Sequence, residues 1–201
     1  MTLVEDIVVK RLGRVEYAST WEAMRAFTRA RDESTPDELW LLEHPPVYTV
    51  GQGTLLPSIP NAIPVLKTDR GGDITYHGPG QAVLYTLVDL ARRSIKVKRF
   101  VWLLEQAVID LLGARAERKA GAPGVYVDGA KIAALGIRVV RGRAYHGLAL
   151  NVDMDLSPFA AIDPCGYPGL RVTQMKDLGF SDSVERASSR LSEILVEKLD
   201  A

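Results

Sequence analysis

Residues 70–81, Arg-Gly-Gly-Asp-Ile-Thr-Tyr-His-Gly-Pro-Gly-Gln, are the part of the sequence best suited to bind a ligand. Their four glycines allow the backbone to approach a ligand closely and to adopt positive φ. Arg70 and His77 could contact a polar group of that ligand. The stretch has neither the Gly-Lys-Ser/Thr of a Walker A loop nor a Gly-x-Gly-x-x-Gly fingerprint. A tight turn between two strands is the alternative, although a plain turn does not need Arg, Tyr and His as well.

The single cysteine, Cys165, is a candidate nucleophile. A lone cysteine is usually an inert, buried, small apolar residue. Here prolines and glycines on both sides indicate a rigid, irregular loop, which is a common place for a catalytic group. A thiol reacts as its thiolate, so it needs a cation or a base nearby. The available partners are Lys131 and the three histidines, His44, His77 and His146.

The three histidines and the cysteine match no zinc-binding spacing, so we expect no metal site. Lys131 follows an Asp128-Gly129 turn and begins the apolar run 132–137. A lysine at the end of a strand often simply reaches solvent. A lysine that begins a buried strand could instead be partly desolvated, which disfavours the charged ammonium and suits base chemistry.

The elements that must position these residues follow from the apolar pattern. Strands are predicted at residues 7–9, 39–42, 47–50, 82–90, 125–127, 131–140 and 144–152. The last three of these form an antiparallel meander through turns at 128–129 and 141–142. Helices are predicted from Trp21 to about Arg31, with Ser19 and Thr20 as caps, at 100–112 and at 183–199. Antiparallel pairs with helices between them indicate an α+β domain.

The composition predicts one globular domain over residues 1–201. The chain has 201 residues, of which 47% are hydrophobic and 25% charged, as in ordinary globular proteins. No apolar run approaches the roughly 18–20 residues that span a bilayer, and the acidic N-terminus has no apolar signal core. A single cysteine cannot form an intrachain disulfide. We therefore expect a soluble, cytoplasmic protein that does not bind membranes.

The net charge of zero hides an uneven distribution. Residues 92–143 hold 12 basic and four acidic side chains, a net charge of +8, and the rest of the chain carries −8. Solvated helix and hairpin surfaces would account for this. A docking surface for an acidic partner is the other interpretation, because a clustered field steers encounter. Nucleic acid is a weak candidate, since the chain is neutral and lacks interleaved exposed aromatic residues.

Four segments, in this order at residues 70–81, 129–139, 146–152 and 164–166, together resemble the lipoyl(octanoyl) transferases. These enzymes are octanoyl-acyl carrier protein:protein N-octanoyltransferases of lipoate biosynthesis. The four segments span the interval from residue 70 to residue 166, about half of the chain, and the resemblance departs at Asp73, where many members have glutamine. It implies a single domain of the biotin/lipoate protein ligase-like fold, with a mixed, largely antiparallel sheet flanked by helices.

The resemblance also implies a reaction. Octanoyl passes from octanoyl-acyl carrier protein, through a thioester on Cys165, to a lysine ε-amino group of a lipoyl domain. The expected targets are lipoyl domains of 2-oxoacid dehydrogenase E2 subunits and the glycine cleavage H protein. Lys131 is the expected partner of Cys165, as a base or as a thiolate-stabilising cation, and neither ATP nor another cofactor is needed. The implied acyl-binding residues are Arg70, Gly71, Gly72, Asp73, Ile74, Thr75, Tyr76, His77, Ala134, Leu135, Gly136, Gly147, Leu148 and Ala149.

Two other functions fit parts of the pattern. A lipoate or biotin protein ligase of the same fold would bind an acyl-adenylate in the glycine-rich loop and would need no catalytic cysteine. A non-catalytic module could bind a fatty acyl or lipoyl group without turning it over. A thioester formed on Cys165 without ATP would distinguish the transferase from both.

Overall fold

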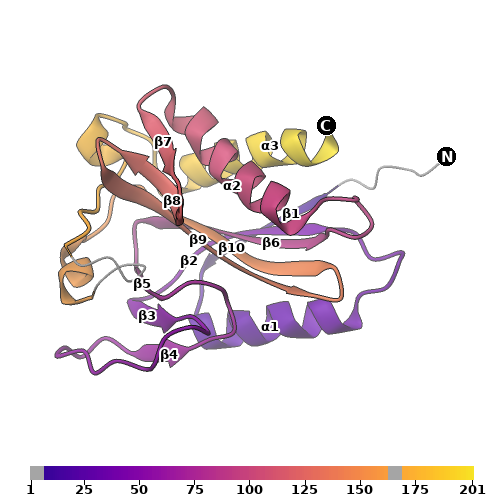
Figure 1. The fold of residues 1–201 in the computed structure, drawn as a ribbon, viewed down its shortest axis with the longest axis horizontal. Helices are drawn as coiled ribbons and strands as arrows, with labels where there is room; N and C mark the ends of the chain where they lie inside the picture. The colour runs from indigo at the N-terminus through magenta and orange to yellow at the C-terminus, as the bar shows by residue number, and fades with distance from the viewer. Residues whose placement is uncertain (1–6, 163–168) are drawn as a thin grey trace.

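The main sheet of the computed structural model carries the elements that surround the site (Figure 1). The structure describes residues 7–162 and 169–201. Within them, seven strands form the main sheet, in the order β1-β2-β6-β10-β9-β8-β7. Their bounds are β1 Val8–Arg14, β2 Glu38–Glu43, β6 Gln81–Asp89, β7 Ala116–Lys119, β8 Ala122–Val127, β9 Ala130–Val140 and β10 Arg143–Asn151. A smaller sheet has the order β4-β3-β5, with β3 at Val47–Val50, β4 at Val65–Lys67 and β5 at Ile74–His77.

Strand pairing makes the main sheet mixed and largely antiparallel. From β2 to β7, each strand pairs antiparallel with its neighbour in the sheet. At the other edge, β1 pairs parallel to β2. The predicted meander is confirmed as β8, β9 and β10. Asp128 and Arg141 each have positive φ in the tight turns that join these strands. The predicted α+β class is therefore confirmed.

Helices cover both faces of the main sheet (Figure 1). α2, at Val97–Leu112, and α3, at Val184–Asp200, lie on one face, and α1, at Tyr17–Ala30, lies on the other. Because side chains alternate along a strand, Leu39 and Leu41 of β2 join the core under α2 and α3. Trp40 and Leu42 join the core under α1. Burial on both faces explains why this strand is a continuous apolar run.

α1 begins four residues before the predicted start at Trp21. The structure begins the helix at Tyr17, so Ser19 and Thr20 lie inside its first turn and do not cap it. Their hydroxyls donate to the carbonyl of Glu16 at 3.2 and 2.7 Å, a bond that serine and threonine make readily within helices. Residue type alone does not distinguish this inward bond from a cap.

The glycine-rich stretch 70–81 is a bend followed by a strand. Ile74–His77 form β5, which pairs antiparallel with β3 in the register Val47 to His77 and Val50 to Ile74. The short strands β4 and β7 are likewise absent from the predicted set. Three or four residues give too little alternation to separate a short strand from a loop.

A buried carboxylate ties together the ends of several elements. Asp37, just before β2, accepts hydrogen bonds from Arg31 at 2.6 Å, Arg92 at 2.8 Å and Arg93 at 2.5 Å. It also accepts the backbone N–H of Asp89 at the end of β6. Burial alone would raise the pKa of Asp37, but these donors outweigh it and hold the pKa below its usual value.

Replacing Asp37 with alanine should lower the free energy of unfolding by about 3–5 kcal/mol, because it leaves buried guanidinium groups without their shared anion. Urea denaturation at neutral pH measures this loss. The matched control is Asp153→Ala, which removes an exposed pair with Lys176 and should cost less than about 1 kcal/mol. Equal losses in the two variants would contradict a structural role for the Asp37 cluster.

Candidate active site

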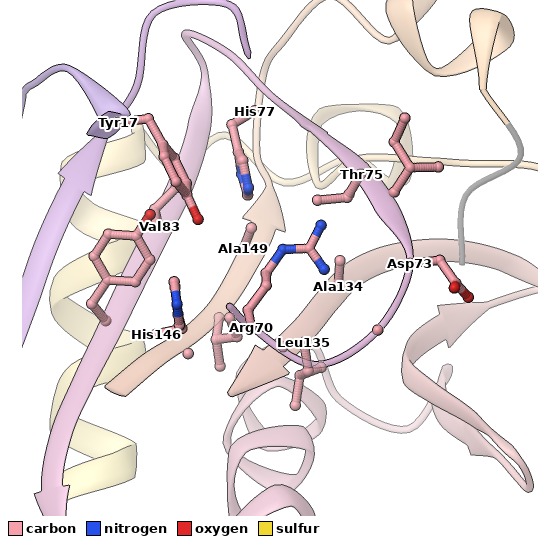
Figure 2. A pocket seen from close by; sticks show the side chains of 16 residues that line it. Tyr17, Arg70, Asp73, Thr75, His77, Val83, Ala134, Leu135, His146 and Ala149 are labelled. Atoms are coloured by element: carbon pink, nitrogen blue, oxygen red, sulfur yellow. The ribbon is translucent and has the colours of Figure 1, made fainter. Parts of the chain in front are cut away.

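A narrow cavity lies where β5 and the bend before it cover the middle of the main sheet (Figure 2). It is lined by Tyr17, Arg70, Gly72, Asp73, Ile74, Thr75, His77, Val83, Tyr85, Ala134, Leu135, Gly136, His146, Gly147, Leu148 and Ala149. Its volume is about 30 Å³. This leaves room for roughly two water molecules, so a longer guest would have to push the lining apart.

Twelve of the 14 residues predicted for acyl binding line this cavity, and Gly71 and Tyr76 do not. Tyr76 lies between Thr75 and His77 on β5, and alternation turns it to the opposite side of the strand. There its ring packs against Tyr48 and Phe159, with ring centres 5.4 and 5.5 Å away. Gly71 instead donates its backbone N–H to the Ile137 carbonyl at 3.0 Å.

A narrow tunnel for an acyl chain would favour small residues at its mouth, but the small size of Gly147 has a different cause. A Cβ at this position would lie 2.1 Å from the Leu84 carbonyl oxygen of β6. A Cβ at Gly136 would lie 2.8 Å from the Gly71 carbonyl oxygen. Both glycines allow backbone to approach backbone, so their size is set by the scaffold around the cavity. Ala134 and Ala149 are the small side chains that line the space itself (Figure 2).

Arg70 holds the bend in place. Its guanidinium donates to the Thr49 carbonyl at 2.5 Å, to the Thr49 hydroxyl at 2.9 Å and to the Gly71 carbonyl at 2.9 Å. The residue is buried. Such bonds satisfy a buried cation that would otherwise be costly. Arg70 therefore fastens the bend to β3 as well as lining the cavity.

Two of the histidines are buried and uncharged: His77 lines the cavity, and His44 packs against it with ring centres 5.9 Å apart. His44 Nδ1 donates to the Val15 carbonyl at 2.7 Å, which leaves Nε2 to accept the Tyr85 hydroxyl at 2.7 Å. His77 Nδ1 is 2.8 Å from the Gln81 amide oxygen. Burial lowers the pKa of His44 to about 4. Burial, with the neighbouring His44, lowers the pKa of His77 to about 3.

His146 also lines the cavity, and it binds Asp69. Its Nε2 donates to the Asp69 carboxylate at 2.8 Å, and Trp21 and Tyr145 donate to that carboxylate as well. Burial lowers the pKa of His146 despite this bond, so the contact is a hydrogen bond at neutral pH. Burial would raise the pKa of Asp69, but the three donors hold it well below its usual range. Desolvation and Asp69 raise the pKa of Tyr145 to about 12.

Sequence reasoning missed Asp69 and three residues that line the cavity, Tyr17, Val83 and Tyr85. They come from α1, β6 and the connection before the bend, outside the predicted motifs. A tyrosine within an apolar strand, such as Tyr85, was the only available signal, because a buried hydroxyl needs a partner.

Lys131 is one of the residues that line a second, smaller cavity beside the first. This cavity is lined by Thr75, Gln81, Lys131, Ile132, Ala133, Ala134, Asn151, Phe159 and Val172, so Thr75 and Ala134 belong to both. Lys131 is 4% exposed, and its Nζ donates to the Pro123 carbonyl at 2.9 Å. The prediction that Lys131 reaches solvent is therefore wrong. The prediction that it is buried at the start of the strand is confirmed.

Cys165 lies outside the described residues. The described chain resumes at Gly169, and its next residues are bound to Lys131. The Lys131 N–H donates to the Arg171 carbonyl at 2.8 Å, and the Thr173 N–H donates to the Lys131 carbonyl at 2.9 Å. Lys131 is thus fastened by its backbone to the segment that follows Cys165 in the sequence.

Within residues 7–162 and 169–201 no group of three or more His, Cys, Asp or Glu side chains could hold a metal ion. No helix of this part of the chain is long and apolar enough to cross a membrane.

Residues 16–195 match the protein family described as the lipoyl protein ligase A/B catalytic domain. An octanoyltransferase of Aromatoleum aromaticum is 63% identical over 192 residues, covering 92% of this chain and 82% of that protein. An octanoyltransferase of Thiobacillus denitrificans is 62% identical, covering 94% and 89%. The chain belongs to the lipoyl(octanoyl) transferase family. Members of this family are acyltransferases.

Solved structures show how widely the octanoyltransferase fold is shared. A putative lipoate protein ligase from Thermoplasma acidophilum superposes with a TM-score of 0.76 at 16% identity, over 97% of this chain and 86% of that one. The biotin protein ligase of Aquifex aeolicus superposes with a TM-score of 0.57 at 9% identity, over 97% and 70%. The predicted biotin/lipoate ligase-like fold is therefore confirmed.

The buried histidines should make stability depend on pH. Their pKa values are lower in the folded than in the unfolded chain, so the unfolded chain binds more protons below about pH 6.5. Stability should therefore fall as the pH falls. Between pH 7 and pH 5 the free energy of unfolding should drop by roughly 2 kcal/mol for each of His44 and His77, and carboxyl groups barely titrate in this window.

Urea denaturation at pH 7, 6 and 5 measures this dependence. The variant His44→Gln should show a shallower dependence, because one of the titrating groups is gone, whatever its stability at pH 7. Equal stability at pH 7 and pH 5 in the unchanged protein would contradict neutral, buried histidines.

Proposed function

We propose that this protein transfers an octanoyl group from octanoyl-acyl carrier protein to a lysine ε-amino group of lipoyl domains. The observation that carries the proposal is a buried lysine, Lys131, which lines a small cavity that shares Thr75 and Ala134 with the narrow, largely apolar cavity. The high identity to proteins named octanoyltransferase supports the choice of acyl group. We expect the reaction to take place in the cytoplasm.

In the first half-reaction the Cys165 thiolate attacks the thioester carbonyl of the donor. The bond between the acyl carbon and the carrier sulfur breaks, and the octanoyl group is held as a thioester on Cys165. The carrier leaves as a thiolate, which takes up the proton that Cys165 lost. Lys131 supports this step as a cation that stabilises the thiolate or as the base that takes its proton.

In the second half-reaction the neutral amine of the target lysine attacks the same carbonyl. An amide bond forms, the bond to the Cys165 sulfur breaks, and the amine loses a proton that Lys131 or the leaving thiolate can accept. The thioester supplies the driving force, so no ATP enters the scheme. We propose lipoyl domains of 2-oxoacid dehydrogenase E2 subunits and the glycine cleavage H protein as acceptors.

The apolar chain gains most of its affinity from burial, at roughly 0.8 kcal/mol for each methylene. Ala134, Leu135 and Ala149 offer it an apolar surface within the cavity. Burial keeps His77, which lines the same cavity, uncharged at neutral pH. A charged histidine would be far less compatible with a methylene chain.

Incubation with octanoyl-acyl carrier protein in the absence of ATP should add the mass of one octanoyl group to the protein, and hydroxylamine should remove it. Intact-protein mass spectrometry measures the adduct. Cys165→Ala should abolish both the adduct and the transfer. Cys165→Ser should retain little activity, because an alkoxide forms much less readily than a thiolate.

Each rival function makes a different prediction in this experiment. A lipoate ligase would show no adduct and would transfer octanoate only with ATP. A binding module would retain the acyl group in Cys165→Ala and would transfer none in the unchanged protein. Full transfer by Cys165→Ala would overturn the covalent mechanism.

Enlarging Ala149 should shorten the acyl chain that the protein accepts. In Ala149→Leu the new side chain would occupy the cavity, and loss of burial for three methylenes would lower kcat/KM for octanoyl by roughly 50-fold relative to butanoyl. Competition between octanoyl and butanoyl donors gives this ratio, which is independent of the fraction folded.

Gly147→Val is the control for the cavity variant. Its side chain would collide with the β6 backbone at Leu84, so it should lower stability and reduce transfer of both chain lengths alike. An unchanged octanoyl-to-butanoyl ratio in Ala149→Leu would show that the acyl chain lies elsewhere.

A further inference from the structure

The side chain of Lys131 lies across the neighbouring strand β8. Its Nζ donates to the Pro123 carbonyl at 2.9 Å and lies 5.6 Å from the centre of the Tyr126 ring. Tyr126 pairs with Lys131 in the register of β8 and β9. The position of the amine therefore depends on the backbone of β8 at residues 123 and 124.

Gly124 leaves the space that this side chain occupies. A Cβ at Gly124 would lie 2.5 Å from Cε of Lys131, 3.0 Å from its Nζ and 2.8 Å from the Ala133 carbonyl oxygen. The φ of Gly124 is +136°, a conformation that strongly favours glycine. Any side chain here would strain the strand and push the amine out of its place.

Glu105 of α2 holds the other side of the same peptide. Its carboxylate accepts the Gly124 N–H at 3.0 Å, and it pairs with Arg118 at 3.0 Å. Glu105 is buried, and α2 lies against the sheet next to β8 (Figure 1). A peptide unit is planar, so fixing the N–H of residue 124 also fixes the direction of the carbonyl of residue 123.

Glu105, the peptide bond between residues 123 and 124, and Lys131 form a chain of two hydrogen bonds. The Glu105 carboxylate accepts from the N–H, and the carbonyl of the same peptide accepts from the Lys131 amine. The peptide dipole points its positive end at the carboxylate and its negative end at the amine, and hydrogen bonds in such a chain strengthen one another. A purely structural explanation is that Glu105 only provides an acceptor for the buried N–H of Gly124.

We propose that Glu105 and Gly124 are positioning residues for Lys131, acting through the peptide bond between Pro123 and Gly124. The inference deepens the proposed function, since it assumes that Lys131 acts in octanoyl transfer. Neither residue needs to touch the substrate. Misplacing a reacting group by about 1 Å can cost roughly 100-fold in rate, so the loss of this support should be measurable in kcat.

Glu105→Ala should lower kcat by roughly 10- to 100-fold with little change in KM. Glu105→Gln should recover most of this loss, because its amide oxygen can still accept the Gly124 N–H. Asp110→Ala, on the same helix but at an exposed position paired with Lys198, is the matched control and should leave kcat unchanged. Circular dichroism and the Tm of each variant confirm that it is folded.

A second readout follows the thiol. In Glu105→Ala the pH midpoint for alkylation of Cys165 by iodoacetamide should shift in the same direction as in Lys131→Ala. The double variant should show no further shift, because both changes remove the same influence. A residue that only stabilises the fold would leave the midpoint unchanged.

The glycine is tested without any assay of activity. Gly124→Ala should lower the Tm, and should lower it less when Lys131 is already alanine, because part of the collision is gone. Gly121→Ala is the control, since Gly121 has a φ of +77° with open space around it. Its effect on the Tm should be the same in both backgrounds.

The outcomes separate the inference from the proposed function. If Lys131→Ala transfers octanoyl at the normal rate, the catalytic role of Lys131 is wrong, and the Tm comparison still tests the contact. If Lys131→Ala is impaired while Glu105→Ala keeps its kcat and its alkylation midpoint, the positioning role is overturned. Equal Tm losses for Gly124→Ala in the two backgrounds would overturn it as well.

Discussion

The site depends on one close contact between two backbones. The bend before β5 rests on β9 because Gly71 donates its N–H to the Ile137 carbonyl and Gly136 leaves room for the Gly71 carbonyl. This contact holds the bend and β5 of the smaller sheet against the main sheet, and the cavity lies between them. Arg70 reinforces it from beneath by binding Thr49 and the bend together. A side chain at Gly136 would lift the bend, and the cavity would lose one wall.

Burial of polar groups gives this cavity its character. Histidine and tyrosine rings make up one wall, and their hydrogen-bond partners keep them in place at little electrostatic cost. Desolvation keeps His44 and His77 uncharged at neutral pH. Asp69 remains ionised, but it faces Trp21 and Tyr145 as well as the wall, so its charge is balanced by donors. The cavity therefore has one wall of uncharged rings, and its charged lining residues are Arg70, which is bonded to Thr49 and Gly71, and Asp73.

The Lys131 amine is held by contacts that lead to α2, the helix packed on β8. α2 packs on β8 as part of the ordinary core, and Glu105 on that helix accepts a β8 backbone N–H. The peptide that donates this N–H also accepts from Lys131. Packing on one face of the sheet is thereby linked to the placement of the Lys131 amine.

The sequence by itself determined the class of fold, the meander of β8 to β10 and most of the cavity lining. Apolar alternation and turn residues are local signals that predict the strands and the meander. The resemblance to the lipoyl(octanoyl) transferases implied the lining segments 70–77, 134–136 and 147–149. Only the tertiary structure decided the rest. Tyr85 and Asp69 reach the site because strands distant in sequence become neighbours, and no local pattern encodes that distance. The small size of Gly147 is explained by the β6 backbone, which lies beside it only in the folded sheet. Burial of Lys131 is likewise a property of the folded state, because it requires the strand beside it, the segment after Cys165 and the space that Gly124 leaves open.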